Sequence, residues 1–159
     1  MRLLAYGVKV LSELPDVTVY IDAGAPDWQG VPTIARKLKA VGVGRVRGFM
    51  LNATHQATTR SNIRYGLSLS RRLGGKHFIV NTSHNGNGPD TRLSYGSRWC
   101  NPPNEAAGAL PTTHTANSMV DAYLWVERPG FSNGTCNGGP TTGHWWEERA
   151  VQMVDRARW

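Results

Sequence analysis

The feature that most constrains the fold is an alternation of short apolar runs with segments of helical period. The apolar runs have the length of strands and lie at 17–22, 47–52, 76–81 and 120–126. Helical periodicity follows at 33–40, 59–73 and 145–158. This alternation is typical of β-α units around a parallel sheet. Because 159 residues suffice for about one domain, we predict a single α/β domain over residues 1–159.

Polar residues end the first three predicted strands, and two long loops follow the last two strands. Asp22, Asn52 and Asn81 each stand directly before a small or turn-forming residue. Sites of β-α proteins gather at the carboxyl ends of their strands. The loops at 82–119 and 127–144 are much longer than ordinary connections and are therefore expected to be functional or disordered. We expect them over the carboxyl ends of the sheet.

The chain has two cysteines, Cys100 and Cys136, one in each long loop. Neither belongs to a C-x-x-C pattern, and the five histidines are dispersed, so no metal site is expected. In an oxidising compartment the two cysteines can form one bridge, worth about 4 kcal/mol for a loop of this length. In a reducing cytoplasm they stay thiols. A bridge would tie the loops together as a lid over a cleft.

The net charge of +7 comes from 18 Lys and Arg against 11 Asp and Glu. The basic residues are scattered rather than clustered, which argues against nucleic-acid binding. No window reaches the roughly 18 uninterrupted apolar residues of a membrane-spanning helix, so no membrane partner is expected. The first ten residues are predicted to form a helix rather than a signal peptide, because Lys9 and Glu13 interrupt any apolar h-region.

Five motifs spaced along nearly the whole chain resemble those of glycoside hydrolase family 6, which contains endoglucanases and cellobiohydrolases. They are YIDAGAPDW at 20–28, GFMLN at 48–52, NTSHNGNGP at 81–89, WCNPP at 99–103 and VDAYLWV at 120–126. The resemblance implies a distorted β/α barrel that hydrolyses β-1,4-glucan with inversion, using no metal or organic cofactor. It also implies that this chain is the C-terminal half of the catalytic domain, a half barrel with about four parallel strands. The family's general acid lies upstream of this half and is expected to be absent.

Several positions depart from the family pattern. The loop after the fourth strand has Glu127 in place of Lys, Phe131 in place of Glu, and Asn133 in place of the Asp that is the family's candidate base. Asn81 and His84 stand where the family has Asp and Arg. An amide cannot accept a proton at neutral pH, so Asn133 cannot act as a general base. No catalytic residue is therefore expected to be intact.

Some positions that contact sugar in the family are kept. The resemblance assigns stacking on glucose rings to Trp28 and Trp99, and a hydrogen bond near the substrate to Asn52. The alternative is that the tryptophans are core or loop anchors and that Asn52 forms a turn. Asp27 and Glu127 are carboxylates near the expected cleft. Neither is expected to replace the lost groups, because the sequence does not fix the separation of about 6.5–9.5 Å that inversion requires.

Other acidic and aromatic residues are interpreted as structural. Asp22 and Asp121 are expected to accept hydrogen bonds rather than to catalyse. Trp125, Trp145 and Trp146 are expected to be core or packing residues, the last two on the closing helix.

Three functions remain open from the sequence. The first is a cellulase-like protein for hydrolysis of β-1,4-glucosidic bonds, truncated and inactive or weakly active. The second is a non-catalytic glucan-binding module, and the third is a basic interaction protein. The expected partners are β-glucan or cello-oligosaccharide, and either a separately encoded N-terminal half or a second copy joined at the open sheet edges. The resemblance implies secretion, although a cytoplasmic location stays open because no signal peptide is recognised.

Overall fold

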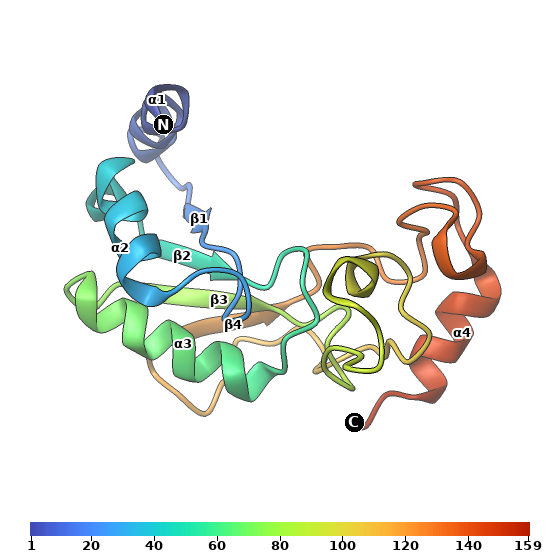
Figure 1. Ribbon diagram of the computed structural model, residues 1–159. Coiled ribbons are helices and arrows are strands. Elements are labelled where there is room, and N and C mark those ends of the chain that lie inside the picture. The colour runs from blue at the N-terminus through green and yellow to red at the C-terminus, as the bar shows by residue number, and fades with distance from the viewer.

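A computed structural model describes residues 1–159 and contains one open sheet of four parallel strands (Figure 1). The strands are β1 (Tyr20–Asp22), β2 (Gly48–Leu51), β3 (His77–Asn81) and β4 (Val120–Leu124), and they lie in that order. All four predicted strands exist, but each is shorter than its apolar run. The first loses residues 17–19, because β1 pairs with β2 only from Tyr20 to Asp22.

The four α-helices are α1 (Arg2–Ser12), α2 (Val31–Ala40), α3 (Thr59–Arg72) and α4 (Glu147–Asp155). The predicted N-terminal helix is confirmed. Helix α2 starts two residues earlier than predicted, because Pro32 in its first turn needs no backbone hydrogen bond there. None of the helices has the length and hydrophobicity that crossing a membrane would require.

The closing helix is shorter at both ends than the predicted 145–158. Trp145 lies outside it and pairs with Phe131 in an isolated antiparallel bridge. Trp146 is extended, with φ −124° and ψ 92°, and caps the helix. The expectation that both tryptophans lie on the helix is therefore wrong.

Helices α2 and α3 pack on one face of the sheet and form the hydrophobic core with it. Phe49 of β2 and Phe78 of β3 stack with ring centroids 5.2 Å apart, in the same core cluster as Leu69 of α3. Gly66 lets α3 pack close to β3, because a Cβ at that position would collide with the Phe78 ring. The apolar faces of α2 and α3 therefore bury this face of the sheet.

The opposite face carries a polar cluster with one residue from each strand or its start. Asp121 of β4 accepts hydrogen bonds from Tyr20 Oη at 2.7 Å and Arg47 Nη2 at 2.7 Å, and lies 2.9 Å from His77 Nδ1. Tyr20 and Asp121 are on the two outer strands, so their contact requires a sheet curved about this face. Asp121 accepts hydrogen bonds here, as the sequence predicts.

The two long loops carry two 3₁₀ helices, η2 (Tyr95–Trp99) and η3 (Cys136–Gly138), which lie beyond the carboxyl ends of the strands, whereas residues 112–119 of the first loop run back beside β4. A disulfide joins Cys100 to Cys136, whose Cα atoms are 6.0 Å apart. Thr112 forms two backbone hydrogen bonds of 2.9 Å with Tyr123, covering part of the outer edge of β4. The edge of β1 has no such cover.

Candidate functional site

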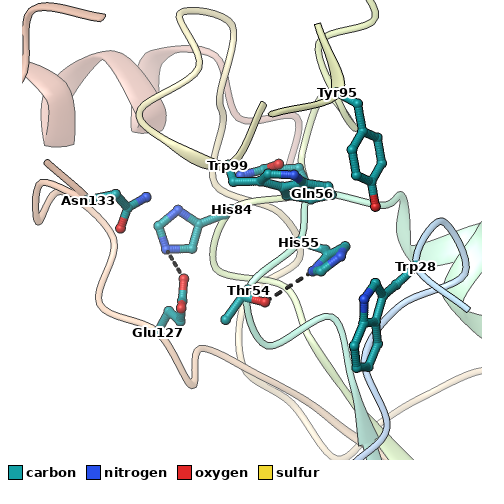
Figure 2. Close-up of a pocket in the computed structure, with 9 residues that line it drawn as sticks. All are labelled: Trp28, Thr54, His55, Gln56, His84, Tyr95, Trp99, Glu127 and Asn133. Atoms are coloured by element: carbon teal, nitrogen blue, oxygen red, sulfur yellow. Dashed lines mark hydrogen bonds and ion pairs between the residues drawn. The ribbon is translucent and has the colours of Figure 1, made fainter. Parts of the chain in front are cut away.

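A cavity of about 370 Å³ opens beyond the carboxyl ends of the strands (Figure 2). Its size falls within the range of about 300–1,000 Å³ usual for ligand sites. One side is aromatic and the other polar. The lining residues are Trp28, Thr54, His55, Gln56, His84, Tyr95, Trp99, Glu127 and Asn133.

The aromatic side of the cavity comes from three separate segments. Trp28, after β1, is 51% exposed, and Tyr95 of η2 is 50% exposed. Trp99 is held between His55 and Tyr95, with ring centroids 4.0 and 5.1 Å away. Tyr95 Oη donates a hydrogen bond to the backbone oxygen of Asp27 at 3.2 Å, which connects η2 to the segment after β1.

The position of Trp28 depends on Gly24 at the end of β1. Gly24 has φ +75°, and a Cβ there would overlap the Trp28 ring. Its amide donates to Asp22 Oδ1 at 2.9 Å, so Asp22 fixes the turn, as expected for a structural carboxylate. Lys37 Nζ lies over the same ring, 5.6 Å from its centroid. Asp27 is exposed and does not line the cavity.

The polar side of the cavity is connected to a buried chain of charges. His84 Nδ1 lies 2.8 Å from Glu105 Oε1, and Arg149 Nη2 of α4 donates to Glu105 Oε2 at 2.5 Å. His84 Nε2 faces Glu127 Oε2 at 3.5 Å. Burial alone would lower the pKa of His84, but the hydrogen bond and charge of Glu105 outweigh burial and raise it.

The pKa values of the two carboxyl groups in this line of charges, Glu105 and Glu127, shift in opposite directions. Burial opposes the ionisation of Glu105, yet the hydrogen bond from His84 and the nearby Arg149 charge hold the pKa of Glu105 below its usual value. Burial raises the pKa of Glu127, and the charge of His84 opposes that rise. The surroundings of Glu105 therefore favour its ionised form in the interior, whereas burial disfavours the ionised form of Glu127 at the cavity.

Asn52 and Asn81 lie behind the cavity rather than in its lining. The Asn52 amide donates to the Asn81 backbone oxygen at 3.0 Å, and the Asn81 amide donates to that of Asn52 at 3.1 Å. Asn52 adopts φ +70° and is 1% exposed. Asn81 Oδ1 also accepts from the backbone amide of Val126 at 3.0 Å. The pair joins the ends of β2, β3 and β4.

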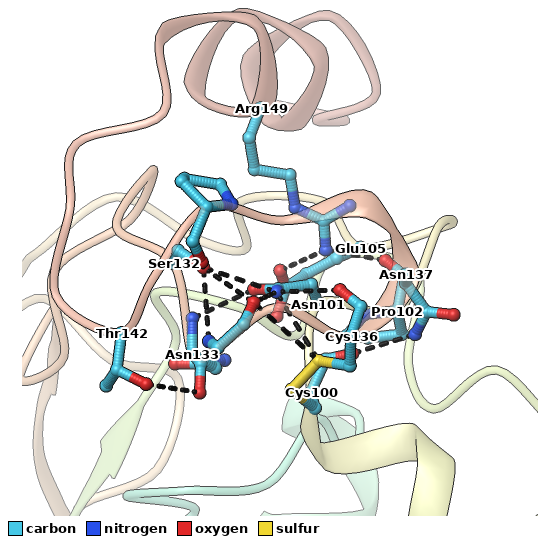
Figure 3. The surroundings of a disulfide bond; sticks show 12 residues. Cys100, Asn101, Pro102, Glu105, Ser132, Asn133, Cys136, Asn137, Thr142 and Arg149 are labelled. Carbon is cyan, nitrogen blue, oxygen red and sulfur yellow. Dashed lines mark hydrogen bonds and ion pairs between the residues drawn. A yellow bond between two sulfur atoms is a disulfide. The ribbon is translucent and has the colours of Figure 1, made fainter.

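Asn133 is held at the cavity by the disulfide-linked loops (Figure 3). Its backbone amide donates to Asn101 Oδ1 at 2.9 Å, and the Asn101 amide donates to the backbone oxygens of Gly134 and Cys136 at 2.7 and 3.1 Å. The Asn133 side chain itself is exposed. Phe131 points elsewhere, beneath Arg128 and against Trp145.

The remaining tryptophans are peripheral to the cavity. Trp125 is partly buried, lies against Trp159 and donates to the Ala109 backbone oxygen at 3.0 Å. Trp145 is 56% exposed and lies outside the core, but it packs edge-on against Phe131 with ring centroids 5.4 Å apart, so of the two expected roles it has the packing one. It projects from the loop because its segment pairs with Phe131 instead of joining α4.

Several site residues were not foreseen from the sequence. Tyr95 and His55 line the cavity, and Glu105 and Asn101 support it from behind. The only sequence signal near Glu105 is a carboxylate directly before two small apolar residues, Ala106 and Ala107, and this signal does not identify its distant partners His84 and Arg149. No three His, Cys, Asp or Glu side chains come together to hold a metal ion.

The fold and the site define an α/β protein of β/α-barrel type, with a cleft at the carboxyl ends of its parallel strands. The chain belongs to Glycosyl hydrolases family 6, whose profile matches residues 1–157. It is 44% identical to endoglucanase A of Cellulomonas fimi over 156 residues, covering 98% of this chain and 33% of that protein. A 1,4-beta-D-glucan cellobiohydrolase of Podospora anserina is 31% identical, with 89% of this chain and 41% of that protein covered.

A solved structure that is similar to this chain is also that of an endoglucanase. The endoglucanase Cel6 of Mycobacterium tuberculosis, in complex with methyl-cellobiosyl-4-deoxy-4-thio-β-D-cellobioside, superposes with a TM-score of 0.91 at 42% identity. The alignment covers 97% of this chain and 52% of that one. The chain therefore spans about half of that structure and a third of the bacterial relative. The predicted fold class, a partial β/α barrel of family 6 with four parallel strands, is confirmed.

Proposed function

We propose that this chain binds β-1,4-glucan in the cavity beyond its sheet and hydrolyses unactivated glucan weakly or not at all. The observation that carries the proposal is the aromatic side of the cavity, formed by Trp28, Tyr95 and Trp99. Sugar rings present apolar faces with polar edges, which suits an aromatic surface beside hydrogen-bonding groups. His84, Glu127 and Asn133 supply those groups on the other side.

The family supports glucan as the ligand. The Mycobacterium tuberculosis relative was solved with a thio-linked cello-oligosaccharide, and the superposition includes nearly all of the present chain. Trp28 and Trp99, which the family resemblance assigns to sugar stacking, both line the cavity. Asn52 is assigned instead to the buried amide pair with Asn81, because its side chain has almost no exposed surface.

Weak hydrolysis follows from the composition of the cavity. Inverting hydrolysis requires one carboxyl group as acid and a second as base. Glu127 is the only carboxyl group among the residues that line the cavity, and Asn133 carries an amide that cannot accept a proton. Each missing acid or base typically costs about 10²–10⁴-fold in rate.

Titration with cellopentaose, followed by tryptophan fluorescence and calorimetry, tests the proposal. We expect saturable binding that Trp28→Ala weakens about 2- to 12-fold, the equivalent of about 0.5–1.5 kcal/mol for loss of one aromatic contact. Trp159→Ala is the matched control, because Trp159 is similarly exposed at 61% but lies outside the cavity. Absence of binding, or equal weakening by both variants, would refute the proposal.

The same purified protein also tests the alternative function, that of a basic interaction protein. Retention on an anionic polymer that falls with salt, combined with no response to cellopentaose, would favour that alternative.

A further inference from the structure

Glu127 is the only carboxylate exposed to the cavity. It also borders a second cavity of about 310 Å³ that shares His84 and Asn133 with the first. Its side chain is 36% exposed, so water reaches the carboxyl oxygens from both cavities. By contrast, the Asp121 cluster lies at the start of the strands, away from these cavities.

His84 is oriented toward Glu127 by groups that are themselves buried. The His84 side chain is 5% exposed, and its Nε2 has no hydrogen-bond partner although it is directed at Glu127. Glu105 holds the other ring nitrogen, and Arg149 holds Glu105. A second carboxylate on the far side of a histidine fixes the ring orientation and favours protonation of both ring nitrogens.

Four side chains of alternating charge therefore run from α4 to the cavity: Arg149, Glu105, His84 and Glu127. The groups that act on Glu127 are His84 at 3.5 Å and, through space, the carboxylates of Glu105 and Asp22. Buried ion pairs contribute little to stability compared with apolar packing. An ordered charge chain that ends at a solvent-accessible carboxylate has the form of a proton-transfer site.

We propose that Glu127 is a general base of the cavity and that His84, fixed by Glu105, is its positioning residue. The inference rests on the proposed binding of glucan at this cavity. A water molecule between Glu127 and a bound sugar ring gives one proton to a Glu127 carboxyl oxygen while its oxygen bonds to the anomeric carbon. The bond from that carbon to the leaving oxygen breaks, and its electron pair departs on the leaving group.

This step needs no acid when the leaving group is a stable anion. The test substrate is therefore 2,4-dinitrophenyl β-cellobioside, whose aryloxide departs without a proton. We expect the full chain to release dinitrophenolate, with the α-anomer of cellobiose as the first product. Glu127→Gln is expected to lower kcat/KM by about 10²–10⁴-fold. The control is Asp155→Asn, which removes an exposed carboxylate of α4 that lines neither cavity; it should leave the rate unchanged.

The pH profile tests the positioning role of His84. The positive charge of His84 lowers the pKa of Glu127, so its removal in His84→Gln should raise that pKa. The base is active when ionised, and the acidic limb of the rate profile should therefore move to higher pH in this variant. Circular dichroism checks that the variant folds. If it does not, Glu127→Asp is measured instead and should retain more activity than Glu127→Gln.

Binding and hydrolysis are scored separately, so the two proposals fail differently. Cellopentaose binding without release of dinitrophenolate, or with release that Glu127→Gln leaves intact, overturns the role of Glu127 and leaves glucan binding standing. A β-anomer as the first product also overturns it, because retention would make the carboxylate a nucleophile. Loss of cellopentaose binding in the unmodified chain refutes the proposed function itself.

Discussion

Asp121 collects hydrogen bonds from Tyr20 and Arg47 and a contact with His77, and this concentration of partners makes it a determinant of acid stability. The hydrogen bond with Arg47 lowers the pKa of Asp121 to about 2. The unfolded value is about 3.9, so the folded state favours the ionised carboxylate. The stabilisation is present above pH about 4 and is lost as pH falls toward about 2.

Asp121→Asn should therefore weaken the pH dependence of stability in that window, and the part that remains comes from other carboxylates with lowered pKa, such as Glu105. The measurement is the urea midpoint of unfolding between neutral and strongly acidic pH. Asp155→Asn, which removes an exposed carboxylate on α4 without an ion pair, should keep the dependence. An unchanged acid profile in Asp121→Asn would contradict the role of the cluster in stability.

The side chains that line the cavity were easier to predict from the sequence than the side chains that hold them from behind. Trp28, Trp99, Glu127 and Asn133 all line the cavity, and they belong to motifs or long loops that could be recognised. The supporting Glu105 could not be predicted, because its partners are 21 and 44 residues away in the sequence. Only the packing of α4 against the long loop brings these charges together.

At the scale of elements, the disulfide is the main connection between the two long loops. Cys100 directly follows η2, which carries Tyr95 and Trp99, and Cys136 begins η3. The two cysteines are 36 residues apart in sequence, and closing a loop of that length stabilises the fold by about 4 kcal/mol. Reduction should therefore lower stability and loosen the aromatic side of the cavity.

The double variant Cys100→Ser and Cys136→Ser should lose about 4 kcal/mol of unfolding free energy and bind cellopentaose more weakly. Urea denaturation and calorimetry, each with and without dithiothreitol, measure both effects. Dithiothreitol should lower both the stability and the cellopentaose affinity of the unmodified protein, and it should leave both unchanged in the double variant. An unmodified protein that is insensitive to the reductant would show that the bridge does not stabilise it.

Element types were predictable, whereas element ends were decided by pairing. The apolar run at 17–22 contains β1, but only Tyr20–Asp22 finds a partner on β2. The closing helix starts late because Trp145 pairs with Phe131 across the loop. Periodicity reports the buried face of an element, and it carries no information on which backbone groups find partners.

At the scale of the whole molecule, helices bury one face of the sheet, while the other face carries the partly exposed polar cluster around Asp121 at the start of the strands. Parallel sheets are normally covered on both faces and closed or shielded at their edges. Here Thr112 shields part of β4, while the outer edge of β1 stays open. Next to that edge, α1 exposes Leu3 at 83% and Tyr6 at 67%.

An open strand edge beside an apolar helix face should drive this chain to self-associate when no other chain covers it. Sedimentation velocity over a range of concentrations should show a monomer in exchange with larger species. Leu3→Lys combined with Tyr6→Lys places charge on α1 and should shift the distribution to monomer, whereas Trp159→Lys, a change at an exposed residue of the C-terminal segment, should not. A monomer at every concentration with a sharp thermal transition would contradict this expectation. It would show that neither the open edge of β1 nor the apolar face of α1 holds copies of this chain together.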